Sequence, residues 1–140
     1  MSRTADLITA AQRARLSARA AYSGFRVGAA IETRKGRIFG GCNVESATYG
    51  LTVCAERVAI WKALSEGETE FQRIAVVTDS DRLTPPCGAC RQIIWEYCGD
   101  IEVILANIAG EKAHYRFNEL FPLPFDKSFL AGSTKQTDRA

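Results

Sequence analysis

Three cysteines and one glutamate constrain this chain more than any other residues. Cys54 and Glu56 occur in one short segment, and Cys87 and Cys90 in a second. Three thiolates can hold one Zn²⁺ and leave its fourth coordination position open, whereas a structural zinc site closes with four protein ligands. A carboxylate two residues from a ligand could then move the protons of a water at the open position. The pattern therefore predicts a catalytic zinc site built from two distant segments.

The size and composition of the chain are typical of a globular protein. Its 140 residues are 46% hydrophobic and 24% charged, so we expect one domain over residues 1–140 with a flexible tail at about 131–140. The net charge of +2 indicates neither a nucleic-acid nor a membrane partner. The five cysteines are an odd number and include a Cys-x-x-Cys pair, which favours reduced thiols in the cytoplasm over a secreted disulfide framework.

The apolar patterns predict strands that alternate with helices. Helices are expected at residues 4–20, about 53–66 and about 88–97, and strands at 27–33, 37–44, 73–78, 101–106 and 113–117. Thr52 is the expected N-cap of the second helix, and Asn118 that of a short final turn. Because such alternation requires crossovers, the predicted fold class is α/β, a three-layer α/β/α sandwich around a mixed five-stranded sheet.

The spacing of the cysteines suits a shared metal ion. Cys87 and Cys90 are three residues apart at an expected helix start, so both sulfurs can lie on one helix face. Cys54 lies near the start of another helix, and the free N–H groups of both N-termini would stabilise the negative charge of three thiolates on one Zn²⁺. Arg57 could add a cation. Glu56 is offset from Cys54 by about 200° around a helix, so it can reach the open position only from the first turn.

Other interpretations of the cysteines explain less. A redox pair would account for Cys-x-x-Cys but not for Cys54 beside Glu56. A structural four-cysteine site would need Cys42 or Cys98, but these lie in a strand pattern and at a helix end and are typical of small buried hydrophobic residues. His114, the only histidine, lies in an expected edge strand and is not an expected ligand. Catalytic zinc is therefore favoured over structural zinc.

Four motifs follow one another along the chain. They are YSGFRVGAA at residues 22–30, GCNVE at 41–45, CAER at 54–57 and PCGACRQ at 86–92. At these residues the chain resembles the cytidine deaminases, specifically the short-chain type that forms homotetramers. The resemblance implies one Zn²⁺ per chain on the three cysteines and hydrolytic deamination of cytidine and 2′-deoxycytidine with release of ammonia. It also implies that Glu56 moves a proton from the attacking water to N3 and later to the departing amine.

The same resemblance implies a nucleoside pocket shared between subunits. Asn43 and Glu45 would hydrogen-bond the ribose hydroxyl groups, and Phe25 would flank the base. Tyr49 and Phe125 would complete the pocket across a subunit boundary. The expected substrate-binding residues are therefore Phe25, Asn43, Glu45, Tyr49, Ala55 and Phe125. For the two phenylalanines, packing in the core is the alternative.

Three other functions compete with this one. Deamination of another aminopyrimidine nucleoside, such as blasticidin S, is disfavoured by Glu45, because the resemblance associates the Asn-x-Glu ribose pair with cytidine deaminases and not with the blasticidin type. A polynucleotide deaminase would need a basic groove and aromatic platforms, for which a nearly neutral chain offers little. A non-catalytic zinc-stabilised binding module would tolerate replacement of Glu56 by Gln without a change in function.

Overall fold

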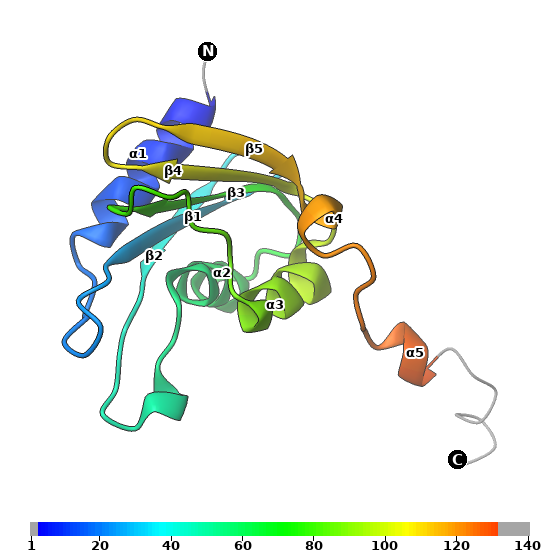
Figure 1. Ribbon diagram of the computed structural model, residues 1–140. Helices are drawn as coiled ribbons and strands as arrows, with labels where there is room; N and C mark the ends of the chain where they lie inside the picture. The colour runs from blue at the N-terminus through cyan, green and yellow to red at the C-terminus, as the bar shows by residue number, and fades with distance from the viewer. Residues whose placement is uncertain (1–2, 132–140) are drawn as a thin grey trace.

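One mixed sheet of five strands forms the centre of the computed structural model, which describes residues 3–131 (Figure 1). The strands are β1 (Val27–Thr33), β2 (Ile38–Cys42), β3 (Phe71–Thr78), β4 (Glu102–Asn107) and β5 (Lys112–Arg116), in the spatial order β2-β1-β3-β4-β5. Strands β3 and β4 pair in parallel, whereas the other neighbouring pairs within the described residues are antiparallel. The mixed five-stranded sheet is therefore confirmed, with β5 at one edge as expected.

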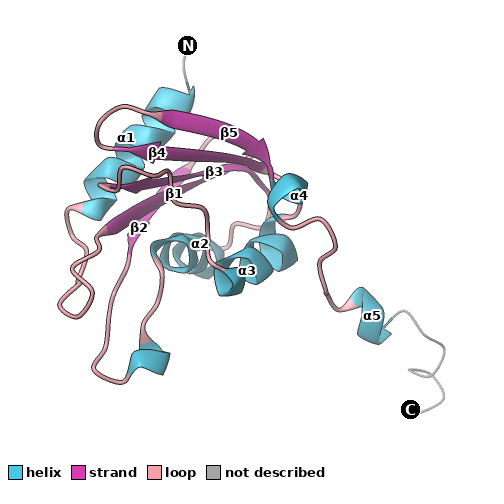
Figure 2. Cartoon of the chain, viewed as in Figure 1, coloured by secondary structure: helices cyan, strands magenta, loops and turns pink. Residues whose placement is uncertain are grey.

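Helices cover both faces of the sheet (Figure 2). Helix α1 (Arg3–Arg15) lies on one face, and α2 (Ala55–Ser65) and α3 (Gly88–Cys98) lie on the other. Because side chains alternate along a strand, each face has its own apolar core. The α1 core contains Leu7, Ala11, Ala30, Ala75, Val77, Ile104 and Ala106. The α2–α3 core includes Ile31, Ala59, Ile60, Ile74, Val76, Ile94, Val103 and Leu105. The predicted three-layer α/β/α sandwich is confirmed.

Two glycines allow helices to lie directly against the sheet. A Cβ atom added at Gly28 of β1 would lie 1.9 Å from the Ala11 carbonyl oxygen of α1. One added at Gly41 of β2 would lie 2.4 Å from the Ala59 nitrogen of α2. No other residue type fits at these distances without displacing a helix. The close approach at Gly41 fixes the distance between α2 and the sheet, and the N-terminus of α2 carries part of the cysteine site.

The first helix is shorter than the sequence predicted. The pattern indicated a helix over residues 4–20, but α1 ends at Arg15. The reason is a long-range backbone pairing, because the Arg19 N–H donates to the Asn43 carbonyl oxygen at 2.9 Å and the Glu45 N–H donates to the Arg19 carbonyl at 2.9 Å. Residue 19 thereby joins the end of β2 instead of a last helical turn.

The second helix begins two residues later than expected, and Thr52 is not its N-cap. Val44 and Val53 exchange two backbone hydrogen bonds, of 3.0 and 2.9 Å, so the chain is still extended at residue 53. The Thr52 hydroxyl oxygen accepts the Ser46 N–H at 3.1 Å instead. Cys54 is the N-cap of α2. The third helix starts at Gly88 as predicted.

Three short helices complete the described chain. They are η1 (Tyr49–Leu51), α4 (Phe117–Leu120) and α5 (Ser128–Ala131), of which the sequence predicted only the second. Asn118 is not the N-cap of α4, because the Arg116 N–H already bonds the Glu119 carboxylate at 2.7 Å and the helix starts at Phe117. The expected tail at about 131–140 lies, apart from its first residue, outside the described residues. No helix within residues 3–131 is long and apolar enough to cross a membrane.

Candidate metal centre and substrate cavity

The sulfur atoms of Cys54, Cys87 and Cys90 form one cluster, as the sequence predicted. All three lie within 4.8 Å of one another, and the Cys54 and Cys87 sulfurs are 3.8 Å apart. Tetrahedral Zn²⁺ with Zn–S bonds of about 2.3 Å requires sulfur–sulfur distances of about 3.8 Å. Within the described part of the chain, no fourth cysteine, histidine or carboxylate joins the cluster. The donor set therefore fits one Zn²⁺ with an open coordination position.

Two helix starts bring these cysteines together. Cys54 is the N-cap of α2 and Cys87 the N-cap of α3, and neither side chain caps its own helix by a hydrogen bond. Cys90 lies in the first turn of α3 and is fully buried. Unpaired N–H groups and the positive end of the helix dipole favour negative charge at both positions. The local backbone thus supports thiolates where the metal requires them.

Arg57 supplies the cation that the sequence predicted beside the cluster. Its Nη2 atom lies 3.5 Å from the Cys54 sulfur, and its guanidinium lies over the Trp61 ring, 5.9 Å from the centroid. Hydrogen bonding from Cys90, together with that from Arg57, lowers the pKa of Cys54 to about 5. The same hydrogen bond to Cys54, with burial, raises the pKa of Cys90. Cys54 is therefore the thiol that ionises first, whereas ionisation of Cys90 requires the positive charge of a bound metal.

Glu56 occupies the first turn of α2, where its side chain can reach the cluster. The residue is only 4% exposed and lines the same cavity as Cys54 and Cys87. Burial raises the pKa of its carboxyl group to about 7, because a low-dielectric environment disfavours the charged form. Glu56 therefore lies at the helix start that the sequence required and lines the cavity with two of the cysteines, and its role as proton carrier stays a prediction.

The cavity next to the cluster has a volume of about 240 Å³. Seven residues singled out in the sequence line it: Phe25, Asn43, Glu45, Cys54, Ala55, Glu56 and Cys87. The sequence did not predict the roles of Ser23, Val27, Thr52, Val76, Thr84 and Pro85, which line it as well. The motif 22–30 was the only signal for the first two, and nothing in the local pattern pointed to the others.

Glu45 is held at this cavity by the turn that follows α1. Its Oε1 atom accepts the backbone N–H groups of Tyr22 and Ser23, each at 2.9 Å. Its Oε2 atom accepts the Ser23 hydroxyl at 2.5 Å. These hydrogen bonds, the one from the Ser23 hydroxyl above all, lower the pKa of the Glu45 carboxyl group. Glu45 is therefore a fixed, ionised acceptor.

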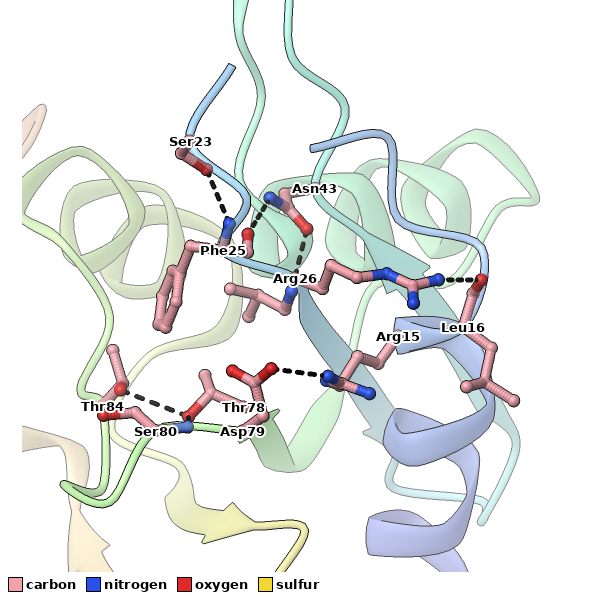
Figure 3. Close-up of polar contacts among 11 residues, drawn as sticks. Arg15, Leu16, Ser23, Phe25, Arg26, Asn43, Thr78, Asp79, Ser80 and Thr84 are labelled. Carbon is pink, nitrogen blue, oxygen red and sulfur yellow. Dashed lines mark hydrogen bonds and ion pairs between the residues drawn. The ribbon is translucent and has the colours of Figure 1, made fainter. Parts of the chain in front are cut away.

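The Asn43 side chain joins the end of β2 to the segment before β1 (Figure 3). Its Oδ1 atom accepts the Val27 N–H at 2.9 Å, and its Nδ2 atom donates to the Phe25 carbonyl oxygen at 2.8 Å. The residue is 7% exposed. The Asn43 side chain also hydrogen-bonds the Glu45 carboxylate, which contributes to the lowered pKa of that group, so the two polar residues lie side by side at the cavity.

The segment after β3 forms the opposite wall (Figure 3). The Thr78 hydroxyl is fully buried, lies 3.4 Å from the Thr84 hydroxyl and accepts the Ser80 N–H at 3.3 Å. Asp79 pairs with Arg15 at the end of α1, at 2.9 Å. These contacts fix the chain that carries Thr84 and the following proline over the cavity.

Tyr49 and Phe125 do not line the cavity of their own chain. Tyr49 is 75% exposed and meets only the Tyr22 ring edge-on among described aromatic residues, at 6.1 Å. Phe125 is 56% exposed and stacks on Phe129 at 5.6 Å. Packing of Phe125 in the core, the alternative left by the sequence, is therefore wrong. Phe25 lines the cavity and is 36% exposed, so it is not a core residue either.

Three further residues lie apart from the cluster, as expected. Cys42 ends β2, and Cys98 ends α3, where burial raises the pKa of its thiol to about 12. His114 lies on the edge strand β5, with Nδ1 2.9 Å from the Glu102 carboxylate. None of the five cysteines forms a disulfide. Because neither Cys42 nor Cys98 joins the cluster of the other three cysteines, a four-cysteine structural zinc site is excluded.

Comparison with known proteins supports this description of the site. Residues 1–106 match the family described as the cytidine and deoxycytidylate deaminase zinc-binding region. A cytidine deaminase from Halalkalibacterium halodurans is 48% identical over 120 residues, which are 85% of this chain and 91% of the relative. A blasticidin-S deaminase from Bacillus cereus is 34% identical over 110 residues, covering 73% of this chain and 78% of the relative.

A solved structure is similar throughout the fold. The 1.6 Å crystal structure of cytidine deaminase from Burkholderia pseudomallei has a TM-score of 0.85 and 45% sequence identity to this chain. The match covers 89% of this chain and 100% of that one. With the three-cysteine cluster and the family match, this chain belongs to the zinc-dependent cytidine and deoxycytidylate deaminase family.

Proposed function

We propose that this chain catalyses the hydrolytic deamination of cytidine and 2′-deoxycytidine to the corresponding uridines, with release of ammonia. One observation carries the proposal: the buried carboxylate of Glu56 and the open side of the cysteine cluster share a cavity with Glu45. A cavity that joins a metal, a proton carrier and a pinned hydroxyl acceptor suits a small polar nucleoside.

Glu56 is the proposed proton carrier of this reaction. When bound, Zn²⁺ supplies a Lewis acid that makes a water molecule nucleophilic at neutral pH. Glu56 accepts a proton from that water and delivers it to N3 of the cytosine ring while the water oxygen bonds C4. Glu56 then takes the proton of the new C4 hydroxyl group and delivers it to the amine, which leaves as ammonia as the C4–N bond breaks and the C4 carbonyl forms. Its burial excludes bulk water, which would otherwise compete for these protons.

The remaining lining residues position the substrate. Phe25 provides an aromatic wall for the base, and Ala55 lies beside the metal ligands at the start of α2. Glu45 and Asn43 would hydrogen-bond the sugar hydroxyl groups. A substrate without those hydroxyl groups leaves these polar groups unpaired, which costs affinity.

We further propose a cytoplasmic homotetramer of single-domain chains in which sites are shared between subunits. Large apolar side chains are exposed between residues 22 and 51 and on the C-terminal segment, including Tyr22, Tyr49, Leu51, Leu123, Phe125 and Phe129. Exposed apolar side chains in such number favour burial against another protein surface. A second copy of the chain could contribute Tyr49 or Phe125 to a cavity that they do not reach in their own chain.

Zinc-loaded protein incubated with cytidine tests the main proposal directly. We expect stoichiometric ammonia release and loss of cytidine absorbance, at one zinc per chain. Absence of turnover with cytidine and 2′-deoxycytidine at full zinc occupancy would refute it.

Deamination of blasticidin S is the second candidate, because a blasticidin-S deaminase is among the similar proteins. Glu45, pinned at the cavity, favours a ribose-bearing substrate instead. Parallel assays with blasticidin S, free cytosine and a single-stranded oligonucleotide distinguish the possibilities, and we expect cytidine to have the largest kcat/KM.

A further inference from the structure

Ser23 links the two parts of the cavity that would recognise the base and the sugar. Its hydroxyl donates to the Glu45 Oε2 atom at 2.5 Å and accepts the Phe25 N–H at 2.9 Å. The second of these contacts is visible in Figure 3. One hydroxyl therefore orients both a carboxylate and an aromatic residue that line the same cavity.

We propose that Ser23 is a positioning residue that sets the preference of this site for nucleosides carrying sugar hydroxyl groups. It does so by holding the Glu45 carboxylate in one orientation before the substrate binds. The inference rests on the function proposed above and assigns a role to a residue that the chemistry itself does not require.

The hydrogen bonds around Glu45 support this role. Two backbone N–H groups hold Oε1, and the Ser23 hydroxyl holds Oε2 at 2.5 Å. The Asn43 side chain also hydrogen-bonds this carboxylate, but the Ser23 hydroxyl has the largest effect on it, so Ser23 contributes most to fixing its rotation. A carboxylate oxygen accepts two hydrogen bonds, so Oε2 keeps one acceptor site for a substrate hydroxyl. Fixing a flexible side chain in advance removes an entropic cost from binding.

The contacts around Phe25 complete the arrangement. Its N–H is held by Ser23, and its carbonyl oxygen is held by the Asn43 Nδ2 atom at 2.8 Å. Side-chain hydrogen bonds thus form one network among four residues that line the cavity: Ser23, Phe25, Asn43 and Glu45. Loss of the Ser23 hydroxyl removes its hydrogen bonds to the Glu45 carboxylate and the Phe25 N–H. The backbone hydrogen bonds to Glu45 and the bond from Asn43 to the Phe25 carbonyl stay in place.

A purely structural role for Ser23 predicts a different outcome. The residue is exposed and lies in a turn outside both apolar cores. Removal of its hydroxyl therefore leaves the packing of the fold intact, and the melting temperature of a Ser23→Ala variant should change by no more than about 2 °C. Substrate discrimination, in contrast, depends directly on the orientation of Glu45.

The test compares zinc-loaded wild-type and Ser23→Ala proteins with cytidine and with 2′,3′-dideoxycytidine, which lacks both sugar hydroxyl groups of the ribose ring. We expect the KM for cytidine to rise about tenfold, while kcat for cytidine and the KM for the dideoxy substrate change less than about twofold. Ser23→Thr, which keeps the hydroxyl, should restore most of the affinity. Ser65→Ala is the matched control, because Ser65 is exposed at the far end of α2.

A second measurement does not depend on turnover. Calorimetric binding of uridine should weaken about tenfold in Ser23→Ala, whereas binding of 2′,3′-dideoxyuridine should not change. In a Glu45→Gln background, the serine substitution should have a much smaller effect on either measurement. Equal losses for both sugars, or no loss for cytidine and uridine, would overturn the inference while leaving the proposed activity intact. Wild-type protein that neither turns over cytidine nor binds uridine would instead refute the proposed function, and this inference with it.

Discussion

Replacement of Gly41 by alanine tests how closely the catalytic helix is tied to the sheet. An added Cβ atom would lie 2.4 Å from the Ala59 nitrogen, 2.8 Å from the Ala55 carbonyl oxygen and 2.9 Å from the Ala59 Cα atom. All three atoms belong to the backbone of α2, so no side chain can rotate away. Helix α2 itself must move away from β2.

The size of this movement follows from the distances. Ordinary van der Waals contact begins at 3.4 Å, so the shortest contact requires a displacement of about 1 Å. Overpacking of this kind costs about 1–3 kcal/mol, and the lower chain entropy of unfolded alanine offsets about 0.4–1 kcal/mol. We expect a net loss of about 1 kcal/mol in the free energy of unfolding, or about 4 °C in melting temperature.

The same displacement should affect turnover, because α2 carries Cys54 and Glu56 at its N-terminus. A misplacement of about 1 Å of a reacting group can lower a rate about 100-fold. Urea denaturation followed by circular dichroism measures the stability, and ammonia release measures kcat/KM. The zinc content per chain distinguishes two causes of lower turnover. Full zinc content indicates displacement of Glu56, and reduced zinc content indicates loss of the metal.

Gly40→Ala is the matched control for Gly41→Ala. This neighbouring glycine faces α1, and its added Cβ would lie 3.3 Å from the Ala14 methyl group and at least 3.7 Å from any other atom outside its chain neighbours. Its stability should stay within about 0.5 kcal/mol of wild type and its turnover within about twofold. If Gly41→Ala behaved like this control, the direct contact of α2 with β2 would be wrong.

Three further predictions concern the glutamate and the cysteines. Glu56→Gln should lower turnover about 10³-fold while zinc content and melting temperature stay at wild-type values, because only the proton carrier is lost; retained activity would exclude its role. Cys87→Ser should lose zinc, measured by atomic absorption, and unfold at a lower temperature than wild type, because metal binding contributes to folding. The raised pKa of Cys98 predicts that stability falls as pH rises above about 8.5, where the unfolded thiol ionises and the folded thiol stays neutral until pH 12, at up to about 1.4 kcal/mol per pH unit. Cys98→Ala should remove that part of the slope in urea denaturation between pH 8.5 and 10.5, and an unchanged slope would contradict the burial of this thiol.

Much of the fold followed from local patterns. The apolar run before Thr78 and the one after Asp100 predicted the two central parallel strands, and Gly99 marked the end of α3. These signals depend on neighbours within a few residues, which an isolated segment already contains. The boundaries at Arg15 and Cys54 could not be predicted in this way, because backbone pairing outside the helices set them. Arg19 pairs with Asn43 and Glu45, which are 24 and 26 residues away, and Val53 pairs with Val44, which is nine residues away.

The sequence by itself determined the chemistry of the metal site. The spacing of Cys54, Cys87 and Cys90 and the nearby Glu56 specified a three-thiolate zinc site with a carboxylate, because ligand type and helical geometry are local properties. Only the tertiary structure decided that Glu56 faces the cavity, that Ser23 holds Glu45, and which segments close around a ligand. Those contacts join residues far apart in the chain, and the packing of α2 and of the turn after α1 against the sheet brings them within hydrogen-bonding distance.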